Sequence, residues 1–307
     1  MASSSPIIVL GSINTDLVIR GPRLPQPGET ILGGEFYQSA GGKGANQAVA
    51  AARACTGPVT FIGAVGDDSL GREAISRFQA ENMICEYLKV VDGQASGVAL
   101  ILVDHQGQNM ISVASGANSF LTPSDVDQIP GAVFAAAKVF LTSLEIPLDT
   151  VLHGLRRARQ SGLLTMLNPA PAPPNGLPED VLQLVDVLTP NETEAALLTG
   201  WNPHEMSDGD ASQVRHAALQ LRSSGCRSVV VTLGARGCFV VDREIAIIPG
   251  RAVAAVDATA AGDAFNGALA AALAEGKPLI EACRWAGAAA AISVTRRGAQ
   301  PTHPTRT

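Results

Sequence analysis

The sequence predicts an α/β protein, a doubly wound and mainly parallel sheet flanked by helices, with a small β-sheet lid. Short runs rich in Val and Ile alternate with Ala-rich segments of helical period along the chain, which is typical of strands and helices that take turns around a parallel sheet. Two segments interrupt this alternation, and they predict the lid. At 307 residues the chain is long enough to bury a large core, so we expect residues 1–307 to form a single domain.

Apolar runs rich in β-branched residues predict the strands of the main sheet. They lie at Ile7–Leu10, Val59–Ile62, Val139–Thr142, Leu163–Leu167, Val185–Leu188 and Ser228–Thr232. The segments between and after these runs have the apolar spacing of helices. They lie at Ala45–Ala54, Gly71–Glu81, Leu148–Gln160, Glu192–Leu198, Ala211–Ser223, Asp263–Ala274 and Leu279–Val294.

Residues 15–40 and 97–115 form the predicted lid. In the second segment, VALILVD, a turn at HQGQ and then NMISVA give the pattern of a hairpin. If the two segments pair with each other, they make a small sheet that stands off the main sheet. Such a sheet is suited to covering a cleft or to meeting the same sheet in a second subunit. The alternative is a hairpin on the edge of the main sheet.

The charge and the apolar content exclude several classes of function. A net charge of −6 gives no basic surface for nucleic acid, so an anionic substrate has to be held at a local site. No apolar run approaches the roughly 18 residues that span a bilayer, so we expect no membrane partner. The five cysteines include no C-x-x-C pair, which argues against a zinc site or a disulfide framework. Since neither end carries a recognisable targeting signal, we expect a cytoplasmic location.

The most informative segment is DATAAGDAFNGALAAALA, at residues 257–274. Its small residues Ala260, Ala261 and Gly262 let backbone N–H groups approach a ligand, and the helix that begins near Gly262 adds unpaired donors and the positive end of its dipole. A phosphate group is stabilised at such a turn. Asp263 would repel it unless this carboxylate takes a proton from the attacking group, so the segment predicts group transfer. The alternative is an ordinary helix with an acidic first turn.

Polar residues also follow other predicted strands. Asn14, Thr15 and Asp16 come after the first strand, where α/β sheets bind ligands, and their side chains suit hydroxyl groups; an Asx turn is the alternative. Glu145 can accept from a sugar hydroxyl or cap a helix. The run GGKGAN lacks the spacing of a Walker A loop. Its glycines let a polyol come close to the backbone, while Asn46 offers both a donor and an acceptor.

Two further segments suit the nucleotide and its metal. In TPNETE, Asn191 and Glu194 are three residues apart at a helix start, so they share one face. Glu194 can hold Mg²⁺ through water while Asn191 orients phosphate oxygens, although a capping box explains the same pair. The segment TLGARG follows a strand, and its glycines allow phosphate or ribose of a nucleotide to lie on the backbone. A plain hairpin turn is the alternative.

These segments together resemble a known family. GSINTD, GGKGANQAVAA, TPNETEA, TLGARG, DATAAGDAFNGAL and AAAISVTRRGAQP occur in this order between Ile7 and Pro301, and the chain is similar to the PfkB carbohydrate kinases, in particular to those that act on ribose. The resemblance implies a doubly wound α/β domain whose β-lid also forms a homodimer interface. It further implies ATP-dependent phosphorylation of D-ribose at the 5-hydroxyl. The alternatives are a kinase for fructose, deoxyribose or adenosine, and a non-catalytic sugar-binding protein of the same fold.

The resemblance also implies a role for each matching residue. Asp263 is the expected base, and the backbone of Ala260, Ala261 and Gly262 is the expected anion hole. The residues expected at the sugar are Asn14, Thr15, Asp16, Gly42, Lys43, Asn46, Glu145 and Asp263. Those expected at ATP are Asn191, Thr232, Gly234, Ala235, Arg236, Gly237, Gly262 and Gly287. Glu194 is expected to hold Mg²⁺ through water, and a K⁺ activator is expected at Asp257, Thr259, Ser293, Arg296, Gly298 and Thr302.

One position departs from the family's pattern. Members that act on ribose often carry Asn near the adenine in the last long helix, and the matching residue here is Gly287. The loss of one neutral hydrogen bond costs about 0.5 to 1.5 kcal/mol, so we expect at most about a tenfold weaker affinity for the nucleotide.

Overall fold

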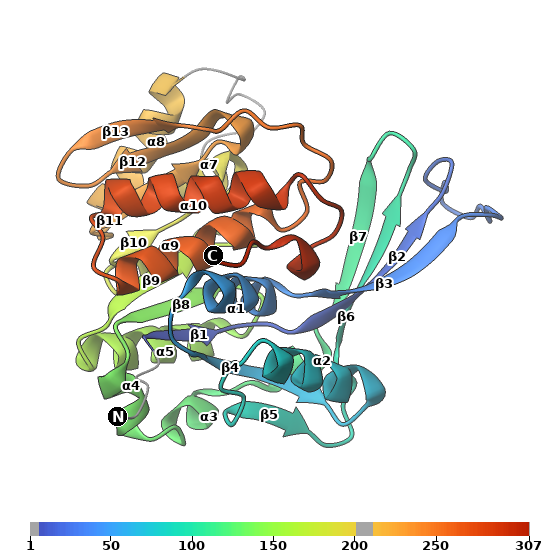
Figure 1. Ribbon diagram of the computed structural model, residues 1–307, viewed down its shortest axis with the longest axis horizontal. Helices are drawn as coiled ribbons and strands as arrows, with labels where there is room; N and C mark the ends of the chain where they lie inside the picture. Colours follow the sequence, from blue (N-terminus) through green and yellow to red (C-terminus); the bar gives the residue numbers. More distant parts are fainter. Residues whose placement is uncertain (1–5, 201–210, 307) are drawn as a thin grey trace.

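The computed structural model describes residues 6–200 and 211–306, which form a layered α/β body and a second, smaller sheet that projects from it (Figure 1). The strands of the main sheet are β1 (Ile7–Leu10), β4 (Val59–Gly66), β5 (Leu88–Val91), β8 (Val139–Ser143), β9 (Leu164–Asn168), β10 (Val187–Leu188), β11 (Ser228–Thr232), β12 (Gly237–Val241) and β13 (Ile245–Pro249). Their order in space is β13-β12-β11-β10-β9-β8-β1-β4-β5. The pairs from β11 to β5 are parallel, and β12 and β13 add an antiparallel edge. The predicted fold class is confirmed.

Helices cover both faces of this sheet. One face carries α1 (Lys43–Ala54), α2 (Ser69–Ala80), α9 (Ala261–Ala274) and α10 (Leu279–Ser293). The other carries α3 (Pro123–Asp127), α4 (Gly131–Ala136), α5 (Leu148–Gln160), α6 (Glu179–Leu182), α7 (Glu192–Thr199) and α8 (Ala211–Ser223). Because successive side chains of a strand point to opposite faces, Val9 packs into the first core while Ile8 and Leu10 pack into the second. Among the described residues, no helix combines the length and the apolar character that a membrane crossing requires.

The small sheet consists of β2 (Asn14–Arg20), β3 (Glu35–Gly41), β6 (Gly97–Val103) and β7 (Asn109–Ala114), in the order β3-β2-β6-β7. Strands β2 and β6 are parallel neighbours, and β6 and β7 form the predicted hairpin. The expectation that the two segments pair with each other is therefore confirmed, and the alternative of an edge hairpin on the main sheet is wrong.

Each predicted strand and long helix is present, with ends that shift by a few residues. The sequence analysis missed β5, β12 and β13. The last two follow β11 as an antiparallel meander with only a short 3₁₀ turn, Gly234–Arg236, between β11 and β12. Because no long helix separates these strands, the alternation used to find the others does not apply to them. The hairpin-turn interpretation of TLGARG is confirmed.

Glycines let α1 come unusually close to its neighbours. A Cβ atom built on Gly267 of α9 would lie 2.5 Å from the carbonyl oxygen of Gln47 in α1. A Cβ on Gly44 would lie 2.5 Å from the backbone of Ser12. Both positions therefore require glycine for steric reasons. As a result, the first turns of α1 and α9 lie side by side at the carboxyl edge of the sheet, where parallel α/β folds bind ligands.

Candidate active site

The helix α9 begins in the small-residue turn that the sequence singles out. Its first residue is Ala261, and Ala260 before it has a left-handed backbone with φ of 58°. The N–H of Ala261 donates within the turn to the carbonyl of Ala258 at 3.2 Å. No side chain caps this helix. The N–H groups of Gly262 and Asp263 therefore stand at an uncapped, positive helix end, which is suited to an anion.

The carboxylate of Asp263 lies on the inner side of this turn and is held by two amides. Asn46 donates from Nδ2 to Oδ2 at 3.0 Å, and Gln47 donates from Nε2 to Oδ1 at 3.0 Å. Asp263 is only 7% exposed. It lies one helical turn before Gly267, on the face of α9 that packs against α1, and this packing brings the two amides within reach.

Several charged groups surround Asp263. Burial raises the pKa of Asp263, while Lys43 and the two amides oppose that rise. Burial, with help from Glu145 and Asp263, raises the pKa of Asp16 to about 6. Burial by itself would lower the pKa of Lys43, but the carboxylates of Asp263, Glu145 and Glu194 raise it above its usual value. The site thus holds one half-buried cation, Lys43, among the acidic side chains of Asp16, Glu145, Glu194 and Asp263.

The root of the small sheet places Asn14 and Asp16 at this cluster. They lie on one face of β2, whereas Thr15 between them faces the other side, because side chains alternate along a strand. Of the three predicted sugar residues on β2, the structure thus brings two together and turns the third away. The Asp16 carboxylate rests on Gly41, where a Cβ atom would lie 2.1 Å from Oδ1.

Glu145 follows β8 and holds the start of α1. Its Oε2 accepts from the hydroxyl of Ser12 at 2.6 Å and from the backbone N–H of Lys43 at 3.0 Å. It thus supplies the cap for α1, next to Gly42, whose φ is 88° and which has no side chain to cap with. Glu145 does not cap α5, the helix that follows it in the chain, but it does accept from the first N–H of α1.

A pocket of about 680 Å³ lies on the other side of the α9 turn. Most of the residues predicted at ATP line it. Residues from β12, β13, α9, α10 and the loop before α9 complete its walls, among them Arg251, Phe265 and Arg284. The predicted residues that line it are Thr232, Gly234, Ala235, Gly237, Gly262 and Gly287. Two others do not line it: Arg236 forms an ion pair with Glu192, and Asn191 lies at the start of α7.

Asn191 and Glu194 form a reciprocal capping box. The backbone N–H of Asn191 donates to Glu194 Oε2 at 2.8 Å, and the backbone N–H of Glu194 donates to Asn191 Oδ1 at 2.8 Å. The capping interpretation of this pair is confirmed. Burial raises the pKa of Glu194, against the opposing effects of the Asn191 N–H and Lys43. Asp263 also raises the pKa of Glu194, which indicates repulsion between the two carboxylates.

The residues predicted at the monovalent cation lie in two segments that touch, the loop before α9 and the stretch from the end of α10 to the 3₁₀ turn Gln300–Thr302. Asp257 accepts from the backbone N–H of Thr259 at 2.9 Å and from that of Gly298 at 2.9 Å. Burial raises the pKa of Asp257, but these donors and the Thr259 hydroxyl bring it below its usual value. The hydroxyls of Ser293 and Thr302 donate to nearby backbone carbonyls, and the exposed Arg296 follows the end of α10. Of these six residues, only Asp257 presents side-chain carboxylate oxygens.

Sequence reasoning missed a group of buried amides behind these residues. Asn118 donates from Nδ2 to Asn14 Oδ1 at 2.9 Å, and its own oxygen accepts from the backbone N–H of Ile13 at 2.9 Å. Gln300 donates from Nε2 to Asn46 Oδ1 at 3.1 Å. Gln47 stands beside Asn46 within the GGKGANQ motif, so its neighbourhood was visible in the sequence. Nothing in the sequence indicated that Asn118 or Gln300 reaches the site.

Comparison with known proteins agrees with this geometry. The family described as pfkB family carbohydrate kinase matches residues 5–306. A ribokinase of Haemophilus influenzae is 43% identical over 301 residues, which cover 98% of this chain and 95% of that relative. The structure of ribokinase from Giardia lamblia has a TM-score of 0.90 at 32% identity, covering 99% of this chain and 97% of the other. That of Arabidopsis thaliana ribokinase complexed with ribose and ATP has a TM-score of 0.88 at 31% identity, covering 98% and 96%. The chain belongs to the pfkB family of carbohydrate kinases.

Proposed function

We propose that this chain phosphorylates D-ribose at its 5-hydroxyl with ATP, giving D-ribose 5-phosphate and ADP. The single observation that carries the proposal is the position of the α9 turn. Gly262 lines the large pocket, whereas the carboxylate of the next residue, Asp263, faces the polar cluster at the root of the small sheet. A base that stands between two binding regions is the arrangement that direct transfer from one ligand to the other requires. The similarity to ribokinases supports the choice of ribose.

Asp263 acts as the general base in this proposal. The 5-hydroxyl attacks the γ-phosphorus of ATP, and its proton passes to the Asp263 carboxylate as the bond from phosphorus to the leaving oxygen of ADP breaks. Phosphoryl transfer asks for little covalent chemistry from the protein and depends on positioning and on neutralising charge. The N–H groups of Gly262 and Asp263 stabilise the transferring group. In the predicted anion hole of residues 260–262, the N–H of Ala261 is the one already engaged within the turn.

The sugar lies between the base and the root of the small sheet in this proposal. Asp16 and Glu145 accept from its hydroxyls, while Lys43, Asn14 and Asn46 donate to its oxygens. Asn118 fixes the orientation of the Asn14 amide, because its Nδ2 donates to the Asn14 oxygen. The amino group of Asn14 is then free to donate to the sugar. We propose that Gly42 brings the backbone close to the sugar. The orientation of Thr15 supports no contact between its side chain and the sugar.

ATP occupies the pocket of about 680 Å³ in this proposal, with its phosphates directed to the α9 turn and its base toward α10. Glu194 borders the charged cluster and, as a carboxylate, suits Mg²⁺, which prefers oxygen ligands and keeps several waters. Among the described residues, no group of three or more His, Cys, Asp or Glu side chains is placed to enclose a metal ion. Coordination through water with the ATP phosphates is compatible with that arrangement. Mg²⁺ would neutralise phosphate charge during transfer.

We also propose that K⁺ activates the enzyme from the loops around Asp257. The Asp257 carboxylate supports this proposal, because it offers oxygen atoms a short distance before the α9 turn. Gly298 donates directly to Asp257, so a cation that orders one loop would order the other. The loop that contains Asp257 leads directly into the α9 turn, which gives the cation a route to the anion hole.

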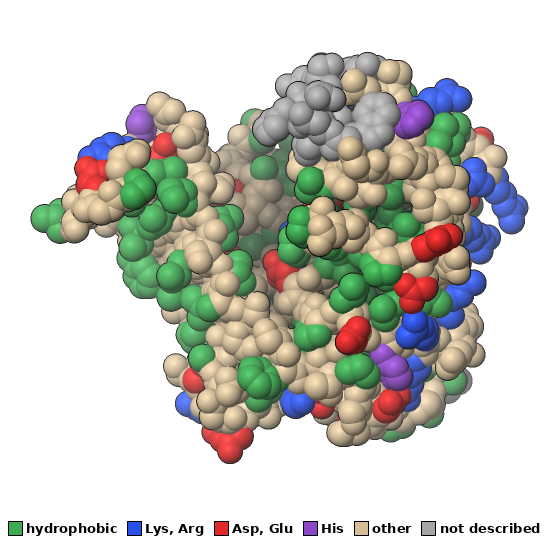
Figure 2. Space-filling model, turned by 180° about the vertical axis from the view of Figure 1, so that it is seen from behind, with side chains coloured by type: hydrophobic (Ala, Val, Ile, Leu, Met, Phe, Trp, Pro, Cys, Tyr) green, Lys and Arg blue, Asp and Glu red, His purple; other side chains and the backbone are tan. Residues whose placement is uncertain are grey.

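We propose that the small sheet acts as a lid and as a homodimer interface. Tyr37, Ile111 and Val113 share the face of Asp16, toward the sugar. The opposite face exposes large apolar side chains, which on a soluble surface favour a partner: Ile19, Phe36, Leu100 and Met110. Figure 2 shows hydrophobic side chains gathered over this sheet and a hollow between it and the main body.

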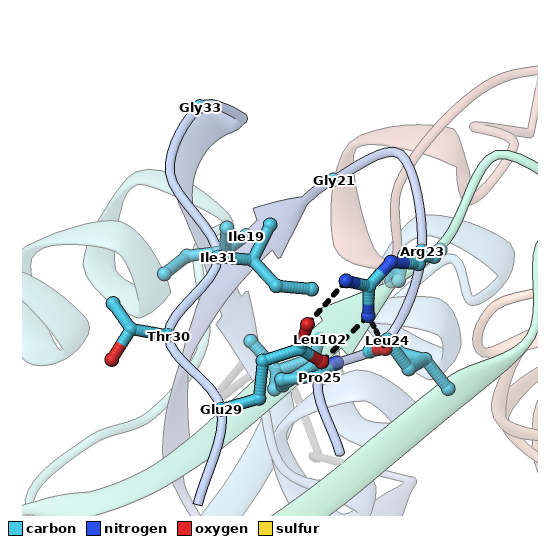
Figure 3. Close-up of a pocket in the computed structure, with 11 residues that line it drawn as sticks. Ile19, Gly21, Arg23, Leu24, Pro25, Glu29, Thr30, Ile31, Gly33 and Leu102 are labelled. Atoms are coloured by element: carbon cyan, nitrogen blue, oxygen red, sulfur yellow. Dashed lines mark hydrogen bonds and ion pairs between the residues drawn. The ribbon is translucent and has the colours of Figure 1, made fainter.

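The tip of the small sheet adds to this apolar character. Ile19, Ile31 and Leu102 line a cavity of about 270 Å³ there, beside the ion pair of Arg23 and Glu29 (Figure 3). A second copy of the same sheet suits these surfaces, because both would bury apolar area. Sedimentation at several protein concentrations tests the dimer, and a monomer at every concentration would refute it.

We further propose a cytoplasmic location, and no nucleic-acid or membrane partner. All five cysteines are free thiols, which fits a reducing compartment. The net charge of −6 opposes binding to nucleic acid.

A coupled assay for ADP release tests the proposed function. Ribose, deoxyribose, fructose and adenosine are compared at equal concentration with Mg·ATP, in KCl and then in a choline salt of equal ionic strength. We expect ribose to give the highest kcat/KM, EDTA to stop turnover, and K⁺ to raise the rate over choline. A higher kcat/KM for adenosine or fructose than for ribose would overturn the assignment. ADP release that does not depend on any of these acceptors would show that the chain is not a kinase for them.

A further inference from the structure

Gln47 is a fully buried side chain on the second turn of α1. Its Nε2 donates to Asp263 Oδ1 at 3.0 Å and to Asn168 Oδ1 at 2.9 Å. A primary amide has two N–H hydrogens, and both are used here. The proposed reaction assigns no role to Gln47, although its amide donates directly to the proposed base.

The orientation of the Gln47 amide is fixed by its surroundings. Asn168 donates from Nδ2 to the backbone carbonyl of Thr189 at 2.9 Å, so its oxygen has to face Gln47. The Gln47 amino group then meets two acceptors, and an exchanged amide would set oxygen against oxygen at both. A chain of hydrogen bonds thus runs from the Thr189 carbonyl through the Asn168 amide to Gln47, whose second N–H points at Asp263.

The other end of Gln47 shows that packing alone does not explain this residue. Its Oε1 is buried and has no hydrogen-bond partner among the described residues. Leaving a buried acceptor unpaired costs about 1 to 3 kcal/mol, a penalty that an apolar side chain of the same shape avoids. An amide at this position is therefore explained by its two N–H donors, one of which is directed at Asp263, and not by packing.

We propose that Gln47 is a positioning residue that fixes the orientation of the Asp263 carboxylate and favours its ionised form; the inference rests on the proposed role of Asp263 as base. Gln47 holds one carboxylate oxygen and Asn46 holds the other. The carboxylate therefore has a fixed rotation, with lone pairs left for the sugar hydroxyl. Gln300 supports the second contact, because it occupies the Asn46 oxygen and turns the Asn46 amino group toward Asp263.

The groups around Asp263 raise and lower its pKa in opposition, so the effect of Gln47 on that pKa can be measured. Burial raises the pKa of Asp263, and the Gln47 and Asn46 donors lower it. Lys43 on α1 also favours the ion. Three carboxylates from other elements oppose it, Asp16 on β2, Glu145 after β8 and Glu194 on α7. Removing one donor leaves burial and these three acids with less opposition, so Asp263 is protonated at a higher pH.

The test is the pH profile of kcat in Gln47→Met, which keeps the length of the side chain and removes its amide. A hydrogen bond to a charged group contributes about 1.5 to 3 kcal/mol, so we expect kcat near pH 7.5 to fall roughly 10- to 100-fold. The acidic limb of the profile should also move to higher pH, so that the loss is larger at pH 6 than at pH 8.5. The affinity for ATP should not change.

Two further variants keep the outcome decisive. Gln79→Met makes the same change on the exposed surface of α2 and should leave the profile unchanged. Gln47→Glu nearly preserves shape, and its carboxylate would share a proton with Asp263, so its acidic limb should move further than that of Gln47→Met. It decides the matter if Gln47→Met does not fold, which thermal melting shows.

A Gln47 variant that folds and keeps the native acidic limb would overturn the proposal, as would an equal loss at every pH. The wild-type assay separates this failure from failure of the proposed function. If ribose is not the substrate, the same profiles are measured with the sugar that the wild-type enzyme does phosphorylate.

Discussion

The two sides of the candidate active site are built in opposite ways. On the side of the proposed sugar, charged and amide side chains are buried or half-buried, and several hold one another, as Asn46 and Gln47 hold Asp263. On the side of the proposed nucleotide, the pocket is lined mostly by glycine, alanine and other small or apolar residues. The first side is defined by the groups that are present and the second by the space that small residues leave. Removing a side chain should therefore matter most on the first side, and adding one should matter most on the second.

The largest effect is expected for Asp263→Asn. A positioned general base contributes roughly 10² to 10⁴ in rate, and the amide of Asn cannot take the hydroxyl proton, so kcat should fall by that factor. The side chain faces α1 and is absent from the pocket lining, so the affinity for ATP should be retained. Single-turnover rates and nucleotide titrations measure the two quantities. Turnover close to that of the wild type would remove Asp263 from the mechanism.

The same contrast explains what the sequence could predict. The parallel sheet follows from local patterns, and Asp263 follows from its place behind small residues at a helix start, which is a local signal as well. The pocket was foreseen through glycines that lie close together in TLGARG and DATAAGD. Its remaining wall, from Arg251 to Ala255 and along α10, carries no motif that indicates a ligand.

The amides behind the site could not be predicted, because each depends on a contact between distant segments. Gln300 reaches Asn46 across 254 positions of the chain, and Asn118 reaches Asn14 across 104. A single glutamine or asparagine in a sequence fits an exposed surface equally well. The orientation of Thr15 could not be predicted for a related reason: the motif GSINTD places it next to Asn14 and Asp16, and only the pairing of β2 shows that its side chain lies on the other face.

A smaller effect is expected for Asp16→Asn, and it tests the cost of a buried charge on the sugar side. The pKa of Asp16 is raised to about 6, so above that pH the folded protein holds an ionised carboxylate that is less favourable there than in the unfolded chain. The carboxylate is the better acceptor for sugar hydroxyls. We therefore expect kcat/KM for ribose to fall about 10- to 100-fold near pH 8, in line with a hydrogen bond to a charged group, while the melting temperature rises.

The pH dependence supplies the control for that prediction. A group with a raised pKa loses its ionised form as pH falls through about 6, so the wild-type kcat/KM should drop there. Asp16→Asn has no carboxyl group to protonate, so it should lose the part of this drop that comes from Asp16 and keep only the acidic limb of Asp263. If the variant melts at a lower temperature at neutral pH, or if its profile near pH 6 equals that of the wild type, then the ionised Asp16 does not destabilise the fold as its raised pKa indicates.

The smallest effect, and the one with the opposite sign, is expected for Gly287→Asn on the nucleotide side. Gly287 lines the pocket from α10, and a Cβ atom there would meet no heavy atom within 4 Å, so the added side chain has room. One new neutral hydrogen bond to the adenine is worth about 0.5 to 1.5 kcal/mol, which lowers the Kd for ATP by at most about tenfold. Gly287→Ala is the matched control, because it stabilises the helix by about 1 kcal/mol without a new polar group and should leave the Kd unchanged. Equal Kd values for the Asn and Ala variants would mean that the adenine does not lie against this turn of α10, and the nucleotide would then have to be turned within the pocket.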